Sequence, residues 1–415
     1  MQILSSRQHS VQPAPGRRTS AWVSWGLLGA VLLALTLQGC GTGPTRAQVP
    51  EQYSATAGIP GIPRARFWGD EAPPWFEGWE AQTTEEIRRS FAGIYGRPHA
   101  YLAVSGGGSD GAFGAGLLNG WTAAGTRPEF TLVTGISTGS LIAPFAFLGP
   151  KYDKVLEEVY TGYSTKDLLA KRPWFTLLTS DSVADTAPLR AKIAEYVTEE
   201  VMRALAAESR KGRRLFIGTV NLDVARPVIW NITAIAASGQ PGSLDLIRNI
   251  MLASASIPGA FPPVYLEVEA NGERYDEMHV DGGTATQVFL YPLGIDWRTV
   301  LRKLQVPGKP RVYVLRNSKI DPKWQAMEPR LVPVIGRSID SLIRTQGIGD
   351  MYRMYLGARR DGLDYHLAYV PEDFDVKSEE IFDPRYMQAL YDLGYRLAKN
   401  GYPWAKEPPG FEAMR

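Results

Sequence analysis

The clearest candidate for a catalytic residue in this 415-residue chain is a serine in a glycine-flanked turn motif. Ser137 stands in Gly135-Ile136-Ser137-Thr138-Gly139, between a strand-like apolar run and a helix-like segment. At such a junction the tight turn exposes the serine as a nucleophile, and glycines are needed because flanking side chains would clash. The start of the following helix favours negative charge that develops beside it. The pattern therefore predicts a nucleophilic serine.

A second glycine-rich segment, Gly106-Gly107-Gly108-Ser109-Asp110-Gly111, also lies between an expected strand and an expected helix. Backbone that is free of side chains and turns into a helix presents N–H groups to an anion. One such anion is a dinucleotide phosphate, because Gly106, Gly108 and Gly111 fit the G-x-G-x-x-G spacing, with Glu129 near the position of a ribose contact. The other is the oxyanion of acyl transfer. The nearby serine turn favours the interpretation as an oxyanion site, because a dinucleotide-binding site does not need a nucleophilic serine.

A serine nucleophile also needs a proton acceptor, which is usually histidine. From Cys40 onward the chain holds only His99, His279 and His366. A carboxylate can replace histidine if burial raises its pKa above the ordinary value near 3.9. Asp281, followed by two glycines after a hairpin-like stretch, is such a candidate. Two interpretations stay open: a dyad with Asp281, or a Ser-Asp-His triad with His366. His279 would share the strand face of Asp281, as a packed or hydrogen-bonded side chain.

The order Gly-Gly-Gly-x-x-Gly, Gly-x-Ser-x-Gly, Asp-Gly-Gly resembles the patatin-like phospholipase family. Two further stretches agree with it, Asn221 to Asp223 followed by Arg226-Pro227, and Ala253 to Pro258 followed by Phe261-Pro262. The resemblance covers roughly residues 99 to 290. It implies a fold related to α/β hydrolases and hydrolysis of lipid acyl esters without a metal.

The resemblance also assigns roles to the motif residues. Ser137 would be the nucleophile and Asp281 the base, while Gly106, Gly107 and Gly108 would supply the oxyanion hole. Family members often carry Arg or Lys just after the glycine triplet. Here Ser109-Asp110 stand there, which leaves a basic contact to a lipid phosphate at that point unsupported.

The segments around these motifs alternate between strand-like and helix-like patterns. Strands are expected at 101–104, 130–134, 215–220, 228–235 and 311–315. Helices are expected at 84–90, 111–121, 154–160, 189–206, 338–356 and 385–399. Strands separated by helices indicate an α/β fold, a mainly parallel sheet with helices on both faces. We expect one hydrolase domain over 83–415, preceded by a tether or N-terminal extension over 40–82 that is rich in Gly, Pro and Trp.

The N-terminus has the features of a secretory signal. Arg17-Arg18 precede a short apolar stretch, 26–37, and small residues follow at Gly39-Cys40. These features predict a signal peptide over 1–39. Cys40 stands where a bacterial lipobox places the lipidated residue, so we expect a lipid anchor in the bacterial cell envelope, at the outer membrane more than the inner, facing the periplasm or the surface. The alternative is an uncleaved signal anchor.

The amino-acid composition limits the classes of partner and cofactor that can be expected. From Cys40 onward the chain carries 42 basic and 43 acidic residues, so its charge gives no reason to expect nucleic acid. One cysteine allows no internal disulfide, and no Cys/His cluster has zinc-ligand spacing, so no metal or other cofactor is expected. The expected substrates are membrane lipids or other acyl esters. A transacylase and a catalytically silent lipid-binding envelope lipoprotein remain as alternatives.

Overall fold

The computed structural model describes residues 46–171, 182, 184–322, 324 and 326–411. Cys40 and the predicted signal peptide lie outside the described residues. One compact unit begins at Ala47, well before residue 83, where the sequence predicted the domain to start. The intervening residues hold only short elements, too short for a hydrophobic period to show: η1 (Glu51–Tyr53), β1 (Arg66–Trp68) and α2 (Phe76–Glu80).

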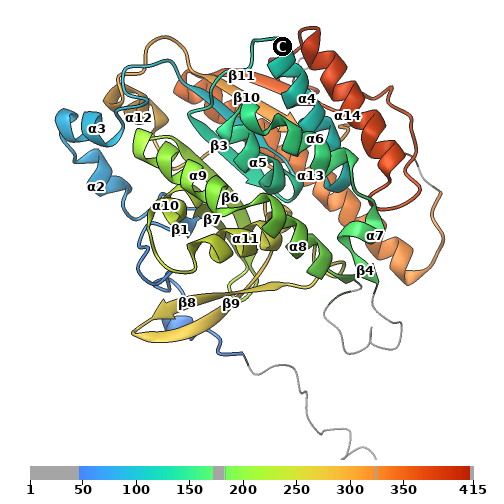
Figure 1. Ribbon diagram of the computed structural model, residues 1–415, viewed down its shortest axis with the longest axis horizontal. Coiled ribbons are helices and arrows are strands. Elements are labelled where there is room, and N and C mark those ends of the chain that lie inside the picture. The colour runs from blue at the N-terminus through green and yellow to red at the C-terminus, as the bar shows by residue number, and fades with distance from the viewer. Residues whose placement is uncertain (1–45, 172–181, 183, 323, 325, 412–415) are drawn as a thin grey trace, which may run out of the picture. The chain divides into compact units, whose positions relative to one another are not determined.

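The centre of this unit is a nine-stranded, mainly parallel sheet in the order β1-β7-β6-β3-β2-β10-β11, with β8 and β9 off this path (Figure 1). Five neighbouring strands are parallel: β6 (Arg214–Asn221), β3 (Leu132–Ile136), β2 (Ala100–Val104), β10 (Arg311–Arg316) and β11 (Asp364–Tyr369). The antiparallel strands are β7 (Arg226–Asn231), β1, β8 (Val264–Ala270) and β9 (Glu273–Asp281). The carboxyl ends of β2 and β3 therefore meet at one edge of the sheet, where the glycine triplet and Ser137 follow them.

Helices cover both faces of the sheet, because successive side chains of a buried strand point to opposite sides (Figure 1). Leu102 and Val104 of β2 pack in the core that contains α4, α5 and α14, whereas Tyr101 and Ala103 pack in the core that contains α13. The predicted architecture is confirmed. No helix in the described part of the chain is both long and apolar enough to cross a bilayer. The helices are α3 (Thr84–Ser90), α4 (Gly111–Ala123), α5 (Thr138–Leu148), α6 (Asp153–Thr161), α7 (Thr165–Leu168), α8 (Ala187–Tyr196), α9 (Glu199–Lys211), α10 (Ile232–Ala237), α11 (Ser243–Ser254), α12 (Trp297–Lys303), α13 (Leu331–Asp361) and α14 (Pro384–Lys399).

A side-chain cap interrupts two of the predicted elements. The helix expected at 189–206 is divided into α8 and α9, because the Thr198 side chain accepts the N–H of Val201 and begins a new helix. The strand expected at 228–235 ends at Asn231, whose side chain accepts the N–H of Ala234 and begins α10. Apolar patterning continues across both boundaries, so the sequence pattern alone does not reveal them.

Candidate active site

Ser137 lies in the turn that connects β3 to α5. Its backbone angles, φ 54° and ψ −127°, are ones that residues other than glycine rarely adopt. The flanking glycines are sterically required. A Cβ on Gly139 would lie 2.3 Å from the carbonyl oxygen of Val104, and a Cβ on Gly135 would lie 2.3 Å from that of Gly139. The strained turn that the G-x-S-x-G pattern predicts is therefore present.

A buried serine at the end of α11 supports this turn. The Oγ of Ser254 accepts a hydrogen bond from the backbone N–H of Ser137 at 3.0 Å and donates one to the carbonyl oxygen of Gly218 at 2.7 Å. Ser254 is completely buried. It therefore ties the turn to β6. The Ala253 to Pro258 stretch suggested its importance in the sequence, but not this contact.

Asp281, the last residue of β9, lies beside Ser137. The two residues are only 4% and 8% exposed, respectively, and the Ser137 side chain lies close enough to the Asp281 carboxyl to favour its ionised form. The N–H of Gly283 donates a hydrogen bond to the Oδ1 of Asp281, at 2.7 Å. Burial raises the pKa of Asp281 to about 7, even though Ser137 and Gly283 both favour the carboxylate. A base with a pKa near neutrality is suited to take a proton from a serine hydroxyl.

The glycine triplet lies against the serine turn. A Cβ on Gly106 would lie 3.1 Å from the Cβ of Ser137. The Gly106 N–H is already donated to the carbonyl oxygen of Gln287 at 3.1 Å, so the prediction that it serves an oxyanion needs correction. Among the residues that the structure describes, none accepts a hydrogen bond from the N–H of Gly107 or Gly108. These two N–H groups are therefore the ones of the triplet that could bind an oxyanion.

Two buried residues that no sequence motif indicated hold the triplet in place. Gln287 binds Gly106 through its carbonyl oxygen and donates its side-chain amide to the carbonyl oxygen of Gly283 at 2.7 Å. It therefore connects the triplet to the turn after Asp281. Asn317 donates its side-chain amide to the carbonyl oxygen of Ser105 at 3.0 Å, and its own carbonyl oxygen would lie 2.0 Å from a Cβ on Gly107.

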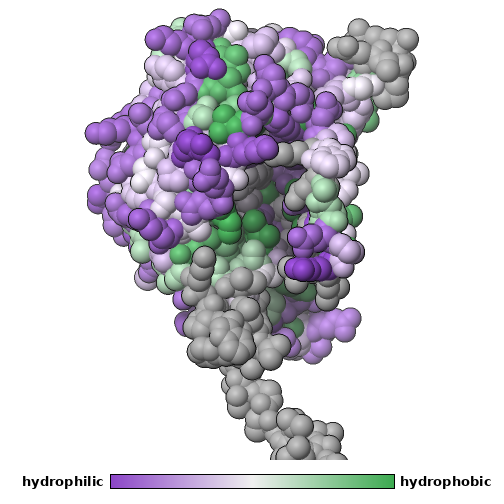
Figure 2. Space-filling view, turned by 90° about the vertical axis from the view of Figure 1, so that its right-hand side faces the viewer, coloured by the Kyte–Doolittle hydropathy of each residue, from purple (hydrophilic) through white to green (hydrophobic). Residues whose placement is uncertain are grey.

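An apolar cavity of about 120 Å³ reaches Ser137 and Gly108. Its rim includes Ile381, which precedes α14 and is 59% exposed. Figure 2 shows hydrophobic side chains gathered between hydrophilic ones on the side of the molecule that carries α7 and α14. Hydrocarbon is the chemistry that such walls accommodate. The wall residues are Leu141, Phe145, Val159, Leu168, Leu189, Ile193, Val197, Met251, Ala255, Ile257, Phe261, Phe382 and Met387, with Thr138, Tyr160, Tyr163, Lys192 and Tyr196 as polar members.

A larger cavity, of about 300 Å³, lies between the sheet, residues 286–294 and α13. Ile136 and Gly282 line it, but neither Ser137 nor Asp281 does. Successive residues of a strand face opposite sides, so this cavity lies behind the serine turn. Of these two cavities, the smaller one is therefore the one that opens to the Ser137 side chain.

The three described histidines are all engaged away from Ser137. The Nδ1 of His366, on β11, lies 3.0 Å from the carbonyl oxygen of Asp364, and its Nε2 lies 2.6 Å from the Nζ of Lys406. Two strands, β2 and β10, separate β11 from β3. The triad with His366 is therefore wrong. His99 contacts the hydroxyl of Tyr101 at 2.9 Å. His279 is completely buried in a polar network, as a hydrogen-bonded residue.

The comparison with protein families agrees with the motifs. Residues 102–293 match the family described as patatin-like phospholipase, and this span contains the glycine triplet, Ser137 and Asp281. No curated protein matches the chain. A solved structure, the crystal structure of VipD from Legionella pneumophila, is 12% identical, with 73% of this chain and 67% of that chain covered and a TM-score of 0.35. The chain therefore contains a patatin-like phospholipase domain over residues 102–293.

Proposed function

We propose that this protein is a lipid acyl hydrolase that works through an acyl-Ser137 intermediate, with Asp281 as the only side-chain base. The observation that carries the proposal is the pairing of Ser137 with a buried carboxyl whose pKa is about 7. The apolar cavity beside Ser137 supports an acyl chain as the group that is bound.

The first half of the reaction acylates the serine. The Ser137 oxygen bonds to the ester carbonyl carbon while its proton passes to the Asp281 carboxylate. The N–H groups of Gly107 and Gly108 donate to the oxyanion, and the N-terminus of α5 adds a favourable dipole. When the ester C–O bond breaks, Asp281 returns the proton to the leaving alcohol, and the acyl chain stays on Ser137.

The second half releases the acid. Water gives a proton to Asp281 as it attacks the acyl carbonyl, and the bond from carbon to the Ser137 oxygen breaks. Asp281 then restores the hydroxyl proton. An alcohol in place of water would give transacylation by the same steps, so product analysis with and without glycerol separates the two reactions.

The test is covalent labelling with a fluorophosphonate probe, together with hydrolysis of p-nitrophenyl esters and defined phospholipids. We expect labelling of the wild type and none of Ser137→Ala, with kcat/KM increasing with acyl length while the chain still gains apolar contact. A lipid-binding protein without activity would leave the probe and all esters untouched. That result would overturn the proposal.

A further inference from the structure

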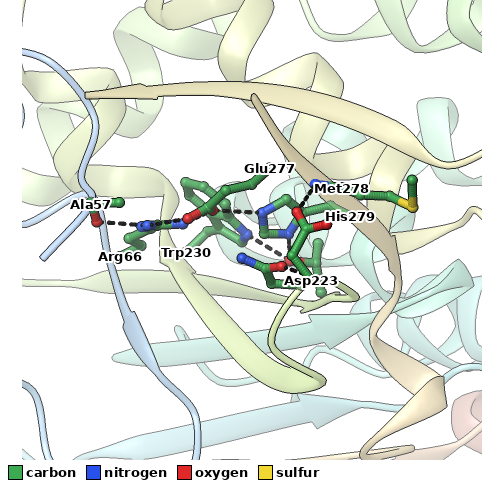
Figure 3. Close-up of polar contacts among 9 residues, drawn as sticks. Ala57, Arg66, Asp223, Trp230, Glu277, Met278 and His279 are labelled. Atoms are coloured by element: carbon green, nitrogen blue, oxygen red, sulfur yellow. Dashed lines mark hydrogen bonds and ion pairs between the residues drawn. The ribbon is translucent and has the colours of Figure 1, made fainter. Parts of the chain in front are cut away.

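A series of buried polar side chains links the N-terminal strand β1 to β9, which carries Asp281 (Figure 3). Figure 3 shows Glu277 of β9 between Arg66 of β1 and His279. The side chains of Arg66, Glu277 and His279 are 8%, 2% and 0% exposed. Thr219 of β6 and Trp230 of β7 complete the network and are also buried. Four strands are thus tied together by side chains and not only by their ladders.

The hydrogen bonds of this network have one consistent direction. Arg66 donates to both carboxylate oxygens of Glu277, one of them at 2.9 Å, and to the carbonyl oxygen of Ala57 at 2.6 Å. The Nε2 of His279 lies 3.1 Å from Glu277, and its Nδ1 lies 2.9 Å from the hydroxyl of Thr219. Trp230 donates to that hydroxyl oxygen at 2.8 Å. Since the Nε2–H of His279 faces the Glu277 carboxylate, its Nδ1 accepts the Thr219 proton.

The protonation states agree with this direction. Burial alone would raise the pKa of Glu277, but hydrogen bonds from His279 and Arg66 lower it to about 2. Burial lowers the pKa of His279, which is therefore neutral, with its proton on Nε2 facing the carboxylate. The network holds one ionised pair, Arg66 with Glu277, and neutral groups beyond it.

This network ends next to the proposed base. Thr219 is the direct partner of Asp281 in the β6–β9 ladder, which contains only three residue pairs. Asp281 is the last residue of that short ladder, and the chain turns away after it. Beyond that ladder, the Asp281 N–H donates one main-chain bond, to the carbonyl oxygen of Ser256 at 2.9 Å. The side-chain contacts of Glu277 and His279 hold the strand that leads to Asp281.

We propose that Arg66 is a positioning residue for catalysis: through Glu277, His279 and Thr219 it holds the end of β9 so that Asp281 stays in reach of Ser137. Arg66 lies outside residues 102–293, so the N-terminal extension supplies a working part of a site that the family match does not include. The proposal rests on the proposed function. His279 has no proton-transfer role in it, because its two ring nitrogens are occupied within the network.

The first test compares two arginine variants of the full chain. Arg66→Met removes the donor to Glu277. We expect kcat on a soluble p-nitrophenyl ester to fall about tenfold to a hundredfold, with KM within about twofold, because misplacement of a catalytic group acts on turnover.

Arg226→Met is the matched control. Arg226 joins the same N-terminal segment to β7 through exposed pairs with Asp70 and Glu71, and has no link to β9. The kcat of the Arg226→Met protein should stay within about twofold of wild type.

Loss of Arg66 leaves the buried charge of Glu277 without a positively charged partner, so a second pair of variants avoids that problem. Thr219→Val keeps the shape but removes the hydroxyl, and Thr219→Ser keeps the hydroxyl but removes a methyl group. Positioning predicts that kcat falls for Thr219→Val and is largely retained for Thr219→Ser. A role in packing alone predicts the opposite order, because only the serine variant loses a buried methyl group.

The outcomes separate this inference from the proposed function. An active wild type with unchanged kcat in Arg66→Met, or with Thr219→Val at least as active as Thr219→Ser, would overturn the inference alone. A wild type that neither cleaves the ester nor reacts with a fluorophosphonate would overturn the proposed function, and the inference with it. Circular dichroism of each variant confirms that folded proteins are being compared.

Discussion

At the scale of single residues, burial of the Asp281 carboxyl affects activity and stability in opposite ways. Its pKa of about 7 makes it a useful base near neutral pH. The same burial means that the ionised form is poorly solvated in the folded protein. The nearby Ser137 hydroxyl and the N–H of Gly283 offset only part of that cost.

The dyad predicts a characteristic pattern of mutant kinetics. Asp281→Asn keeps the shape but removes the base, so kcat should fall by about a hundredfold to ten-thousandfold, as it should for Ser137→Ala. The double variant should be little worse than either single variant, because nucleophile and base act as one unit. His366→Ala should stay within a few-fold of wild type, since His366 lies on β11 among Asp364 and Lys406. A fully active Asp281→Asn protein would contradict the dyad.

The pKa of Asp281 also predicts how activity and stability depend on pH. Activity should rise with pH through about 7, because the ionised form is the base. Stability should change the other way. The folded protein keeps a proton that the unfolded chain, with an ordinary value of 3.8, has already lost, so this group destabilises the fold increasingly as pH rises from about 4 to about 7. Asp281→Asn should therefore gain stability over wild type across that window and level off above it, at most on the order of 4 kcal/mol. Urea unfolding at pH 4, 5.5, 7 and 8 measures this, and an equal difference at all four would contradict it.

At the scale of elements, the junction from β2 into α4 brings backbone donors to the serine. Gly107→Ala should displace them, because its Cβ would lie 2.0 Å from the carbonyl oxygen of Asn317. Loss of one oxyanion donor lowers kcat by about a hundredfold or more, with little effect on KM. Gly125→Ala is a control: Gly125 also has a positive φ, 69°, but open space around it. If a folded Gly107→Ala protein kept its kcat, the triplet would have no oxyanion role.

The elements also differ in how far they could be predicted from the sequence. The strands and helices next to Ser137, and the turn itself, are encoded by residues that are adjacent in the chain, so their patterns could be recognised. The contacts that hold the site together, in contrast, join residues that are far apart in the chain. Ser254 is 117 residues from Ser137, and Arg66 is 211 residues from Glu277. Neither local periodicity nor a motif constrains such pairs, because they are brought together only by the order of strands in the sheet. The Gly106 N–H was misassigned for this reason, since Gln287 reaches it from a distant loop.

At the scale of the whole molecule, we propose that Cys40 attaches the protein to the cell envelope, an expectation that rests on the lipobox pattern alone. An acylated cysteine that carries several chains gives stable attachment where a single chain is marginal. Cys40→Ser should therefore incorporate no palmitate label and should accumulate as the unprocessed precursor. Ser137→Ala serves as the control, because it should be labelled and processed normally. Palmitate in the Cys40→Ser protein would show that the anchor lies elsewhere.

The position of β1 has a consequence for shortened forms of this chain. β1 pairs with β7 and forms one end of the sheet, while the other end, β11, is partly covered by a bridge from Leu367 to Ala405. A polypeptide that starts at residue 83 would lack β1 and would leave the N–H and C=O groups along 228–230 open to pairing with another copy. It would also bury Glu277 without its arginine. We expect such a fragment to aggregate at concentrations where the intact protein gives a single peak in size-exclusion chromatography, so the segment before the family-matched domain acts as a barrier to self-association.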